Sequence, residues 1–300
     1  MIFPKYIRIV EVGLRDGLQN ETIVINTNDK LSLVKSLINS GITNIELTSF
    51  VNPKIIPQLF DAELLLEKVP WNANIAYSAL VPNIKGFERA QKTKLKEITV
   101  FISASESHNK ANVNCTISES LKKIEAICFI AKNKGMKLRG EIAASFGCPF
   151  EGNISSSNLL NIVNKMHGMG CNEIALADTI GIADPKQVYD IFNLINEKIP
   201  GLITAAHLHD TNKRALANIL AAIQASVQIF DSSIGGLGGC PFAPGATGNI
   251  STENLVFMLN KMGIDTGIKI EQLLDSICLI EKLLKKHIDL IPELQKLKNN

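Results

Sequence analysis

The sequence predicts an α/β fold, a (β/α)8 TIM barrel with extra helices at its C-terminal end. Short β-rich runs alternate with longer helical runs along the whole chain, and no linker or shift in composition interrupts them. Eight such units in about 230 residues is the size of a (β/α)8 barrel. A doubly wound open sheet is the alternative, which is weakened because no GxGxxG motif follows the first strand. We expect one barrel domain over residues 1–300, with added helices from about 251 to 297.

The segments that predict strands are mostly apolar on both faces, as strands buried in a parallel sheet are. They span residues 6–12, 44–49, 74–80, 97–103, 137–145, 173–178, 203–209 and 227–233. Helical patterns lie in the gaps between them, among them residues 117–134, 157–169, 185–198 and 211–225. The helix in the first gap is expected to begin after Asn28 as N-cap and to stop at Gly41. Residues 270–297 predict an amphipathic, lysine-rich helix packed on the barrel.

The composition excludes several classes of function. With 46% apolar and 20% charged residues, the chain has the composition of a soluble globular protein. A net charge of +2 argues against nucleic-acid binding, and no apolar run reaches the roughly 18 residues that span a membrane. The six cysteines form no CxxC pair, which indicates reduced thiols. We therefore expect a cytoplasmic protein that binds neither nucleic acid nor membranes.

Polar residues gather at one predicted end of the barrel. In barrel enzymes, the chemistry takes place at the C-terminal ends of the strands. The notable charged and imidazole side chains outside the helices fall at those ends: Arg15, Asp16, Glu46, Asp178, His207, His209 and Asp231. Chance would scatter such residues over both ends, so their distribution predicts an active site at this rim.

The HxH pair formed by His207 and His209 indicates a metal site. Residues two apart in a strand point to the same side, which places the two imidazoles together. The alternative is a pair of hydrogen-bonded barrel histidines without metal. Asp16 offers a carboxylate, with a turn or helix cap as its competing role, and Asn249 offers a side-chain carbonyl. Two imidazoles with two hard oxygens suit Mg²⁺ or Mn²⁺, with zinc as an alternative.

Arg15 is suited to holding a carbonyl or carboxylate and to stabilising an enolate, and a surface salt bridge is the alternative. In an extended segment Arg15 and Asp16 point to opposite faces, whereas in a loop both can turn inward. Glu46 is a charge inside an apolar strand, where it needs a partner. Arg15 is the expected partner, and holding a metal-bound water is the alternative role.

Two further predictions concern charged residues in the fifth and sixth predicted strands. Asp178 is either a proton acceptor or the cap of the turn that follows the sixth strand. Arg139 and Glu141 share a face of the fifth strand, and we interpret them mainly as an internal ion pair.

The segment GGLGGCPFAPGATGN, residues 235–249, follows the eighth strand and carries Cys240. Its glycines allow a loop to open and close over a site, and a thiol can donate a proton near neutral pH. A small buried hydrophobe is the usual role of a single cysteine, but a loop this rich in glycine offers little core. Cys148 sits in the same GCPF motif without the glycine cluster, so we assign it to structure.

These motifs together resemble the 3-hydroxy-3-methylglutaryl-CoA lyase family. The resemblance rests on VGLRDGLQNE (12–21), IELTSFVNPKIIPQLFDA (45–62), GCPFEG (147–152), MGCNEIALADTIG (169–181), AHLHDTNKRALAN (206–218) and DSSIGGLGGCPFAPGATGNISTENLVFML (231–259). It covers the chain to about residue 267. The RDG and HxH motifs alone are typical of the wider superfamily of metal-dependent barrel lyases and Claisen synthases. The GLGGCP loop narrows the resemblance to the lyase family.

The resemblance implies an enzyme that cleaves 3-hydroxy-3-methylglutaryl-CoA to acetyl-CoA and acetoacetate with a divalent cation. It implies four metal ligands, namely Asp16, His207, His209 and Asn249. Arg15 would stabilise the enolate, Cys240 would transfer a proton, and Glu46 and Asp178 would be supporting carboxylates. Gly238 and Gly239 are candidate substrate-binding residues and Glu253 is a weaker candidate for the site. The implied partners are an acyl-CoA substrate and a second copy of the chain in a homodimer.

The chain departs from the family pattern at Asn212, Lys213 and Arg214. The charged side chains of Lys213 and Arg214 either face CoA phosphates or lie in solvent. Two other functions stay open at this point. One is an acetyl-CoA/2-oxo acid Claisen-type synthase, which the length of 300 residues disfavours because such synthases usually carry an extra region. The other is a non-catalytic CoA-binding barrel, against which the complete set of reactive side chains argues.

Overall fold

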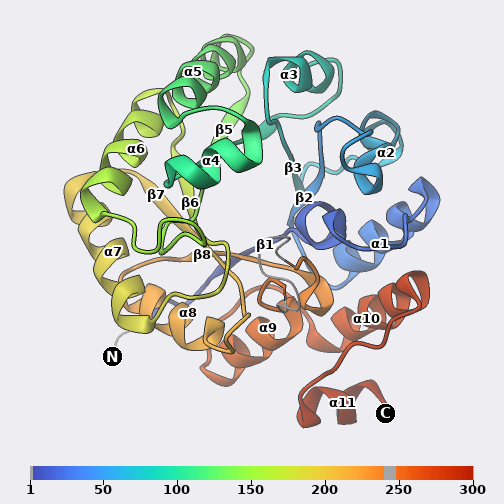
Figure 1. The fold of residues 1–300 in the computed structure, drawn as a ribbon. Helices are drawn as coiled ribbons and strands as arrows, with labels where there is room; N and C mark the ends of the chain where they lie inside the picture. Colours follow the sequence, from blue (N-terminus) through green and yellow to red (C-terminus); the bar gives the residue numbers. More distant parts are fainter. Residues whose placement is uncertain (1–2, 240–247, 300) are drawn as a thin grey trace.

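The computed structural model describes residues 3–239 and 248–299 and contains a closed barrel of parallel strands (Figure 1). The strands are β1 (Arg8–Glu11), β2 (Asn44–Ser49), β3 (Ala76–Leu80), β4 (Glu97–Ser103), β5 (Lys137–Ala143), β6 (Glu173–Asp178), β7 (Ile203–Leu208) and β8 (Ile229–Ser232). Each strand pairs with the next, and β8 pairs with β1 to close the barrel. The predicted (β/α)8 barrel is confirmed, and the open sheet is wrong.

Helices form a ring around the strands in Figure 1. They are α1 (Thr27–Asn39), α2 (Ala62–Lys68), α3 (Ile84–Ala90), α4 (Glu106–Val113), α5 (Ile117–Asn133), α6 (Ser156–Gly168), α7 (Pro185–Lys198) and α8 (Ala215–Gln224). Short helical turns lie at η1 (Gly13–Gly17), η2 (Pro57–Leu59) and η3 (Ile234–Gly236). The turns η1 and η3 follow β1 and β8, so they lie at the C-terminal end of the barrel, where the predicted site residues are.

Two helix starts differ from the sequence prediction. Helix α1 begins after Asn26, whose side chain accepts the N–H of Asp29 at 3.0 Å, so the N-cap is Asn26 and not Asn28. Helix α8 begins at Ala215 and not near residue 211, because Asp210 Oδ1 accepts the Ala215 N–H at 3.0 Å. Both differences have the same cause: a side-chain oxygen satisfies an N–H of the first turn, which periodicity alone does not locate.

The barrel has two different interiors. Apolar side chains such as Leu33, Leu37 and Phe192, all buried, fill the layer between strands and helices, as barrel folds require. Inside the strands, a small cluster consists of Val10, Val12, Ala175, Ala205 and Ile229. The alanines in this cluster, where bulky branched residues are the rule, leave room for long charged side chains in the centre of the barrel.

The C-terminal part forms α9 (Thr252–Lys261), α10 (Ile270–Leu284) and α11 (Pro292–Lys298). The single amphipathic helix expected over 270–297 is wrong, because α10 ends at Leu284, Lys285 follows in the left-handed conformation (φ 50°), and Pro292 begins a new helix. Helix α10 packs against α1, where Ser36 Oγ and Ser276 Oγ lie 2.7 Å apart. The added helices therefore pack on the outside of the barrel, as expected.

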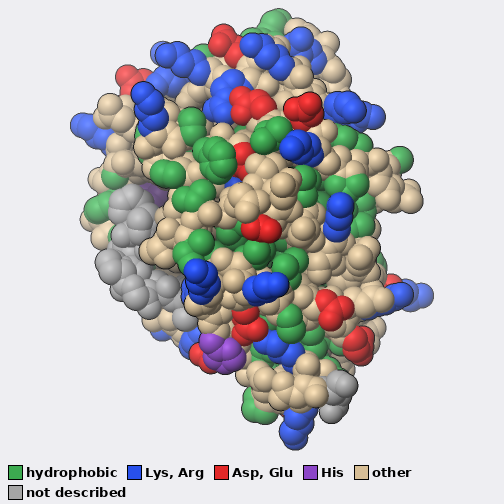
Figure 2. Space-filling model, turned by 90° about the vertical axis from the view of Figure 1, so that its right-hand side faces the viewer, with side chains coloured by type: hydrophobic (Ala, Val, Ile, Leu, Met, Phe, Trp, Pro, Cys, Tyr) green, Lys and Arg blue, Asp and Glu red, His purple; other side chains and the backbone are tan. Residues whose placement is uncertain are grey.

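On the face shown in Figure 2, basic and acidic side chains are interspersed, with apolar side chains between them in small groups. This is the usual outer surface of a helical ring, because polar helix faces point to solvent. Among the helices of residues 3–239 and 248–299, none has both the length and the apolar character needed to cross a membrane.

Gly41 joins the barrel to the C-terminal segment and allows a test of this packing. Gly41 has φ 100°, and a Cβ built on it would lie 2.2 Å from the Gly267 carbonyl oxygen. Gly263 also has a positive φ, 73°, but a Cβ there meets no atom within 4 Å. We expect Gly41→Ala to lower the free energy of unfolding by about 3 kcal/mol, and the control Gly263→Ala by about 1 kcal/mol, in urea denaturation. Equal losses in the two variants would contradict the packing described.

Candidate active site

The turn η1 presents Arg15 and Asp16 together. Arg15 Nη1 donates to Asp16 Oδ1 at 2.6 Å, and both residues line the large cavity at the C-terminal end of the barrel. The segment is a π-helical turn rather than an extended strand, so the loop alternative for this pair is the correct one. Arg15 is only 4% exposed, which rules out a surface salt bridge.

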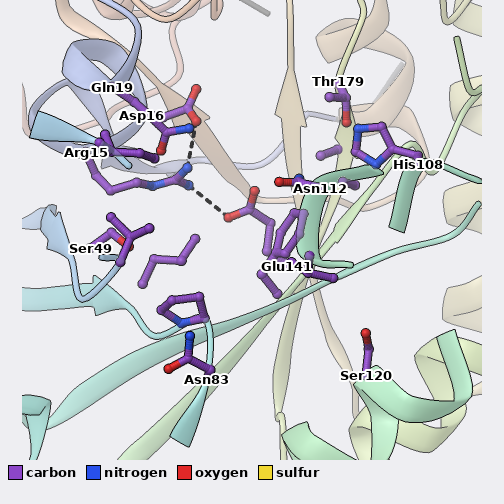
Figure 3. A pocket seen from close by; sticks show the side chains of 18 of the residues that line it. Arg15, Asp16, Gln19, Ser49, Asn83, His108, Asn112, Ser120, Glu141 and Thr179 are labelled. Atoms are coloured by element: carbon purple, nitrogen blue, oxygen red, sulfur yellow. Dashed lines mark hydrogen bonds and ion pairs between the residues drawn. The ribbon is translucent and has the colours of Figure 1, made fainter. Parts of the chain in front are cut away.

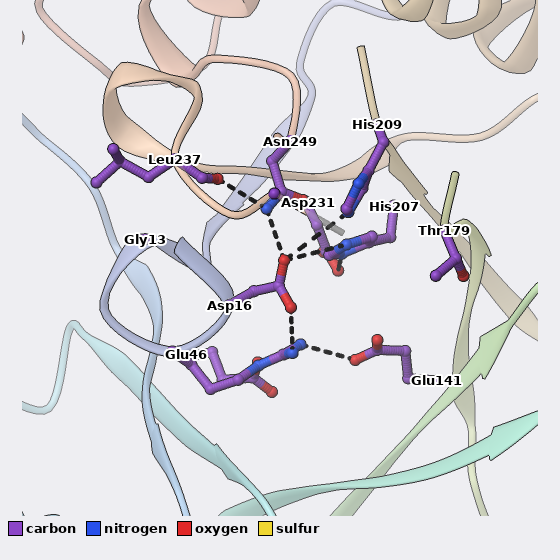
Figure 4. A network of polar contacts seen from close by, with 12 residues as sticks. Gly13, Asp16, Glu46, Glu141, Thr179, His207, His209, Asp231, Leu237 and Asn249 are labelled. Carbon is purple, nitrogen blue, oxygen red and sulfur yellow. Dashed lines mark hydrogen bonds and ion pairs between the residues drawn. The ribbon is translucent and has the colours of Figure 1, made fainter. Parts of the chain in front are cut away.

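Three potential metal ligands meet beside this turn. Asp16 Oδ2 lies 3.9 Å from His207 Nε2 and 3.8 Å from His209 Nε2. The three ligand atoms all lie within 4.8 Å of one another, and both histidines are buried. Figure 4 shows the two imidazoles and the Asp16 carboxylate turned toward one another. The HxH spacing thus places both rings on one side of the chain, as predicted.

Asn249 completes this group from the end of the glycine-rich segment. Its backbone forms an isolated antiparallel bridge with His209, and its Nδ2 donates to Asp16 Oδ2 at 2.7 Å. Asn249 Oδ1 is buried and has no hydrogen-bond partner among the described residues. A buried acceptor without a donor fits a cation as its missing partner. The donor set of two imidazoles, a carboxylate and an amide oxygen suits a divalent cation such as Mg²⁺ or Mn²⁺.

Gly238 explains why this corner of the site needs glycine. Its φ is 103°, and an added Cβ would lie 2.5 Å from Asn249 Nδ2 and 3.0 Å from an Asp16 oxygen. A side chain there would displace the ligand group. The next residue, Gly239, lines the cavity, and its carbonyl accepts a hydrogen bond from Asn20.

Arg15 is held by acidic residues from three segments. Its Nε donates to Glu46 on β2, the partner predicted for Glu46, and its Nη2 donates to Glu141 on β5 at 2.9 Å. Burial by itself would lower the pKa of Arg15, but the Glu46, Glu141 and Asp16 carboxylates raise it above its ordinary value. The guanidinium is therefore a fixed cation whose orientation is set by three elements (Figures 3 and 4).

The expected ion pair between Arg139 and Glu141 is wrong. Arg139 instead donates to Asp231 on β8 through Nη2 at 2.6 Å and Nη1 at 3.1 Å, and to Glu173 through Nε at 2.8 Å. Both side chains point into the barrel, as their spacing requires, but closure brings them partners from other strands. Asp231 in turn accepts from His207 Nδ1 at 3.1 Å.

The two histidines have opposite electrostatic surroundings. Burial alone would lower the pKa of His207, but the hydrogen bond to Asp231 and the charges of Glu141 and Asp16 raise it to about 9. Burial and the positive charge of His207 lower the pKa of His209 to about 4. Burial acts to raise the pKa of Asp16, yet Arg15 and the two histidines lower it below its ordinary value. Asp16 is therefore ionised and available as a ligand.

Asp178 organises a turn. Its two carboxylate oxygens accept the N–H groups of Ile182 and Ala183, each at 3.0 Å, which is the capping alternative predicted for it. Burial raises the pKa of Asp178 to about 6. Its neighbours Ala177 and Thr179 line the cavity, whereas Asp178 itself is not among the lining residues.

Two buried carboxyls hold the turns around the site. Glu253 Oε2 accepts the Gly235 N–H at 3.1 Å. Glu11, which the sequence analysis missed, accepts the N–H groups of Gly13 at 2.7 Å and Ile234 at 2.9 Å and the hydroxyl of Thr252. Glu11 thereby ties the turn after β1 to the turn after β8. Its signal in the sequence was a charge inside an apolar strand, the same signal that identified Glu46.

The cavity has a volume of about 670 Å³ and extends from the ligand cluster toward α4 and α5. In Figure 3 the Arg15 guanidinium points toward Asp16 and Glu141, and Asn83 and Ser120 lie away from this group. Asn114, Cys115 and Lys123 line that farther part. Lys213 Nζ lies 3.8 Å from Asp210 Oδ2, and Arg214 Nη1 donates to the Ile182 carbonyl at 3.4 Å. Neither Lys213 nor Arg214 is among the described residues that line the cavity.

The two cysteines of the GCPF motifs differ in what the structure describes. Cys148 is buried and donates to Ser105 Oγ at 2.9 Å, which agrees with its assignment to structure. Cys240 lies outside the described residues, so its predicted role stays a prediction.

Comparisons with known proteins agree with this geometry. A family model described as HMGL-like matches residues 6–280. The chain is 44% identical over 273 residues to a Homo sapiens protein named "Hydroxymethylglutaryl-CoA lyase, mitochondrial". The match covers 91% of this chain and 84% of the human protein.

Solved structures are similar over almost the whole chain. A Bacillus subtilis HMG-CoA lyase has a TM-score of 0.95 and 40% identity, and the match covers 99% of this chain and 100% of that one. An HMG-CoA lyase from Acinetobacter baumannii, solved in complex with coenzyme A and 3-methylmalate, has a TM-score of 0.91 and 38% identity, and the match covers 96% and 94% of the two chains.

The buried carboxyls around the site predict a pH-dependent stability. Burial raises the pKa of Glu253 from 4.5 to about 7. The folded state therefore binds more protons than the unfolded state between these values, so the stabilisation is complete below about pH 4.5 and is lost as pH rises through 7. We expect the change in unfolding free energy between pH 5.5 and 8 to be about 2 kcal/mol smaller in Glu253→Gln than in the unmodified protein.

Urea titrations at the two pH values measure this effect. The control is Glu293→Gln, at an exposed position on α11, which should leave the pH dependence unchanged. A Glu253→Gln variant with the full pH dependence of the unmodified protein would refute the attribution of this effect to the raised pKa of Glu253.

Proposed function

This chain belongs to the HMGL-like family, and we propose that it is a carbon–carbon lyase that cleaves 3-hydroxy-3-methylglutaryl-CoA to acetyl-CoA and acetoacetate. The observation that carries the proposal is the placement of the Asp16, His207 and His209 ligand atoms beside the fixed guanidinium of Arg15 in one cavity. A site for a cation next to a fixed positive charge is suited to forming an alkoxide and then an enolate.

Asp16, His207, His209 and Asn249 would hold the cation, which we propose is Mg²⁺ or Mn²⁺. When bound, a divalent cation acts as a Lewis acid that makes a coordinated hydroxyl more acidic. Asp16 is held for this task from two sides, by Arg15 and by Asn249. The unpartnered Asn249 Oδ1 supports its inclusion among the ligands.

Arg15 would stabilise the enolate oxygen of the departing acetyl-CoA. A guanidinium has five N–H donors, and the bonds to Glu46, Asp16 and Glu141 use one donor on each nitrogen. One N–H on each terminal nitrogen then stays available for a substrate oxygen. Because three carboxylates fix the guanidinium, it needs no reorganisation as negative charge develops, which is the condition for strong electrostatic stabilisation.

We assign proton transfer to Cys240. After the carbon–carbon bond breaks, the enolate carbon of acetyl-CoA must gain a proton, and a thiol can donate one near neutral pH. The position of Gly239 in the cavity wall, immediately before Cys240 in the chain, supports this assignment. Gly238 and Gly239 would contact the substrate, while Glu46, Asp178 and Glu253 would act by holding Arg15 and the surrounding turns.

The acyl-CoA would enter along the arm of the cavity that leads toward α4 and α5. A volume of about 670 Å³ is within the range of small-molecule sites and accommodates the acyl group with part of the pantetheine chain. Asn83, Asn114 and Lys123 line this arm and offer polar contacts to amide groups. The coenzyme A complex of the Acinetobacter baumannii relative is consistent with such a ligand.

Location and assembly are further proposals. Five of the six cysteines lie in the described part of the chain and are free, which favours a reducing compartment such as the cytoplasm. Homodimerisation stays a prediction from the resemblance.

An activity assay tests the proposed reaction. We expect acetoacetate to form from 3-hydroxy-3-methylglutaryl-CoA with Mg²⁺ or Mn²⁺, and its formation to stop when EDTA removes the cation. Failure to form acetoacetate with either cation, in protein shown by circular dichroism to be folded, would overturn the proposed function.

The assignment of Cys240 predicts a selective loss. We expect Cys240→Ala to lower turnover by about 10²-fold or more while Mn²⁺ binding is unchanged, because only the proton donor is removed. Cys278→Ala, at an exposed cysteine of α10, is the matched control and should keep full turnover. Near-normal turnover of Cys240→Ala would assign that thiol to structure instead.

A further inference from the structure

Asp231 lies directly behind one of the two metal-site histidines. Residues His207 and Asp231 are register partners in the pairing of β7 with β8, and Asp231 Oδ2 accepts from His207 Nδ1 at 3.1 Å. Asp231 is 1% exposed and His207 is 3% exposed, so water does not compete for this bond. We propose that Asp231 is a positioning residue that fixes His207 in the tautomer whose Nε2 binds the cation. The inference rests on the cation site of the proposed function.

The contact of Asp231 with Arg139 determines which atom carries the proton in the hydrogen bond between His207 and Asp231. Arg139 donates to both Asp231 oxygens, at 2.6 and 3.1 Å. This two-point contact with the buried Arg139 guanidinium keeps Asp231 in its carboxylate form. A carboxylate that keeps its charge only accepts hydrogen bonds, so the proton of this contact is on Nδ1. When a cation displaces the Nε2 proton, the neutral ring keeps its proton on Nδ1 and offers the lone pair on Nε2, which lies 3.9 Å from Asp16 Oδ2.

The second histidine lacks this support. His209 Nδ1 is buried and has no hydrogen-bond partner among the described residues, although His209 Nε2 lies at a similar distance, 3.8 Å, from Asp16 Oδ2. Hydrogen bonds to the far nitrogen of a metal-binding histidine fix the ring and its tautomer. The site therefore has one ligand with a fixed tautomer, His207, and one whose ring is placed by packing and by its backbone bridge to Asn249.

An isosteric change at Asp231 should reverse the tautomer. In Asp231→Asn the amide keeps one acceptor oxygen, and the shorter contact, to Arg139 Nη2, favours the oxygen at that position. The NH₂ group then faces His207 Nδ1 and donates to it, which leaves the proton on Nε2. The same change beside the histidine of serine proteases produces the wrong tautomer. A protonated Nε2 has no lone pair for a cation.

The experiment measures Mn²⁺ affinity, by electron paramagnetic resonance of free Mn²⁺, in the full-length protein. We expect Asp231→Asn to bind Mn²⁺ about 10–100-fold more weakly. Glu173→Gln is the matched control, since Glu173 accepts from Arg139 Nε at 2.8 Å but contacts neither histidine in the described hydrogen bonds. Its Mn²⁺ affinity should be unchanged. If Asp231→Asn does not fold, ¹⁵N nuclear magnetic resonance of the unmodified protein with Mg²⁺ tests the tautomer directly: a proton on His207 Nδ1 is expected, and a proton on Nε2 would overturn the inference.

A double-mutant cycle separates positioning from a general structural effect. In a His207→Ala background, Asp231→Asn should no longer change Mn²⁺ affinity, because Asp231 acts through that imidazole. A loss of the same size in that background, or unchanged affinity in Asp231→Asn alone, would overturn this inference and leave the proposed function intact. Absence of Mn²⁺ binding in the unmodified protein would overturn the cation site itself, and this inference with it.

Discussion

Closure of the barrel through the pairing of β1 with β8 is the constraint on which the site depends. Arg8 to Glu11 run in register with Ile229 to Ser232, which places the turn after β1 next to the strand ends of β7 and β8. Asp16 comes from the first of these segments and the two histidines from the last part of the barrel. In an open sheet they would lie on opposite edges, and no cation would be shared between them.

Closure also creates a centre in which several charges must be buried. An isolated buried charge is costly, and a pair repays that cost only when the remaining hydrogen bonds are satisfied. Arg139 meets this condition with Asp231 and Glu173, whereas Arg15 bonds to Glu46, Glu141 and Asp16 and keeps one N–H on each terminal nitrogen for a further acceptor. Around Arg15, one guanidinium faces three carboxylates, so the cluster has an excess of negative charge. A divalent cation beside Asp16 would offset that excess, which links the architecture of the barrel centre to the proposed chemistry.

The acidic residues at this end of the barrel divide into two groups. Asp16 and Glu141 line the cavity. Glu11, Asp178 and Glu253 are buried with raised pKa values and accept backbone N–H groups of the turns. The residues of the second group hold the backbone turns that surround the cavity-lining residues. A carboxyl at the catalytic end of a barrel strand is therefore not by itself a catalytic group, and its hydrogen-bond partners decide its role.

The sequence by itself determined the barrel, its strand positions and the rim that holds the site, because these follow from periodicity within short segments. It also placed His207, in β7, and His209, directly after it, on one side of the chain, since spacing along an extended segment fixes direction. Only the tertiary structure decided the partners of Arg139 and Glu141, the hydrogen bond from Asp231 to His207, and the break between α10 and α11. The physical reason is that such pairings join segments distant in the chain, and the distances and angles between those segments are set by closure and packing.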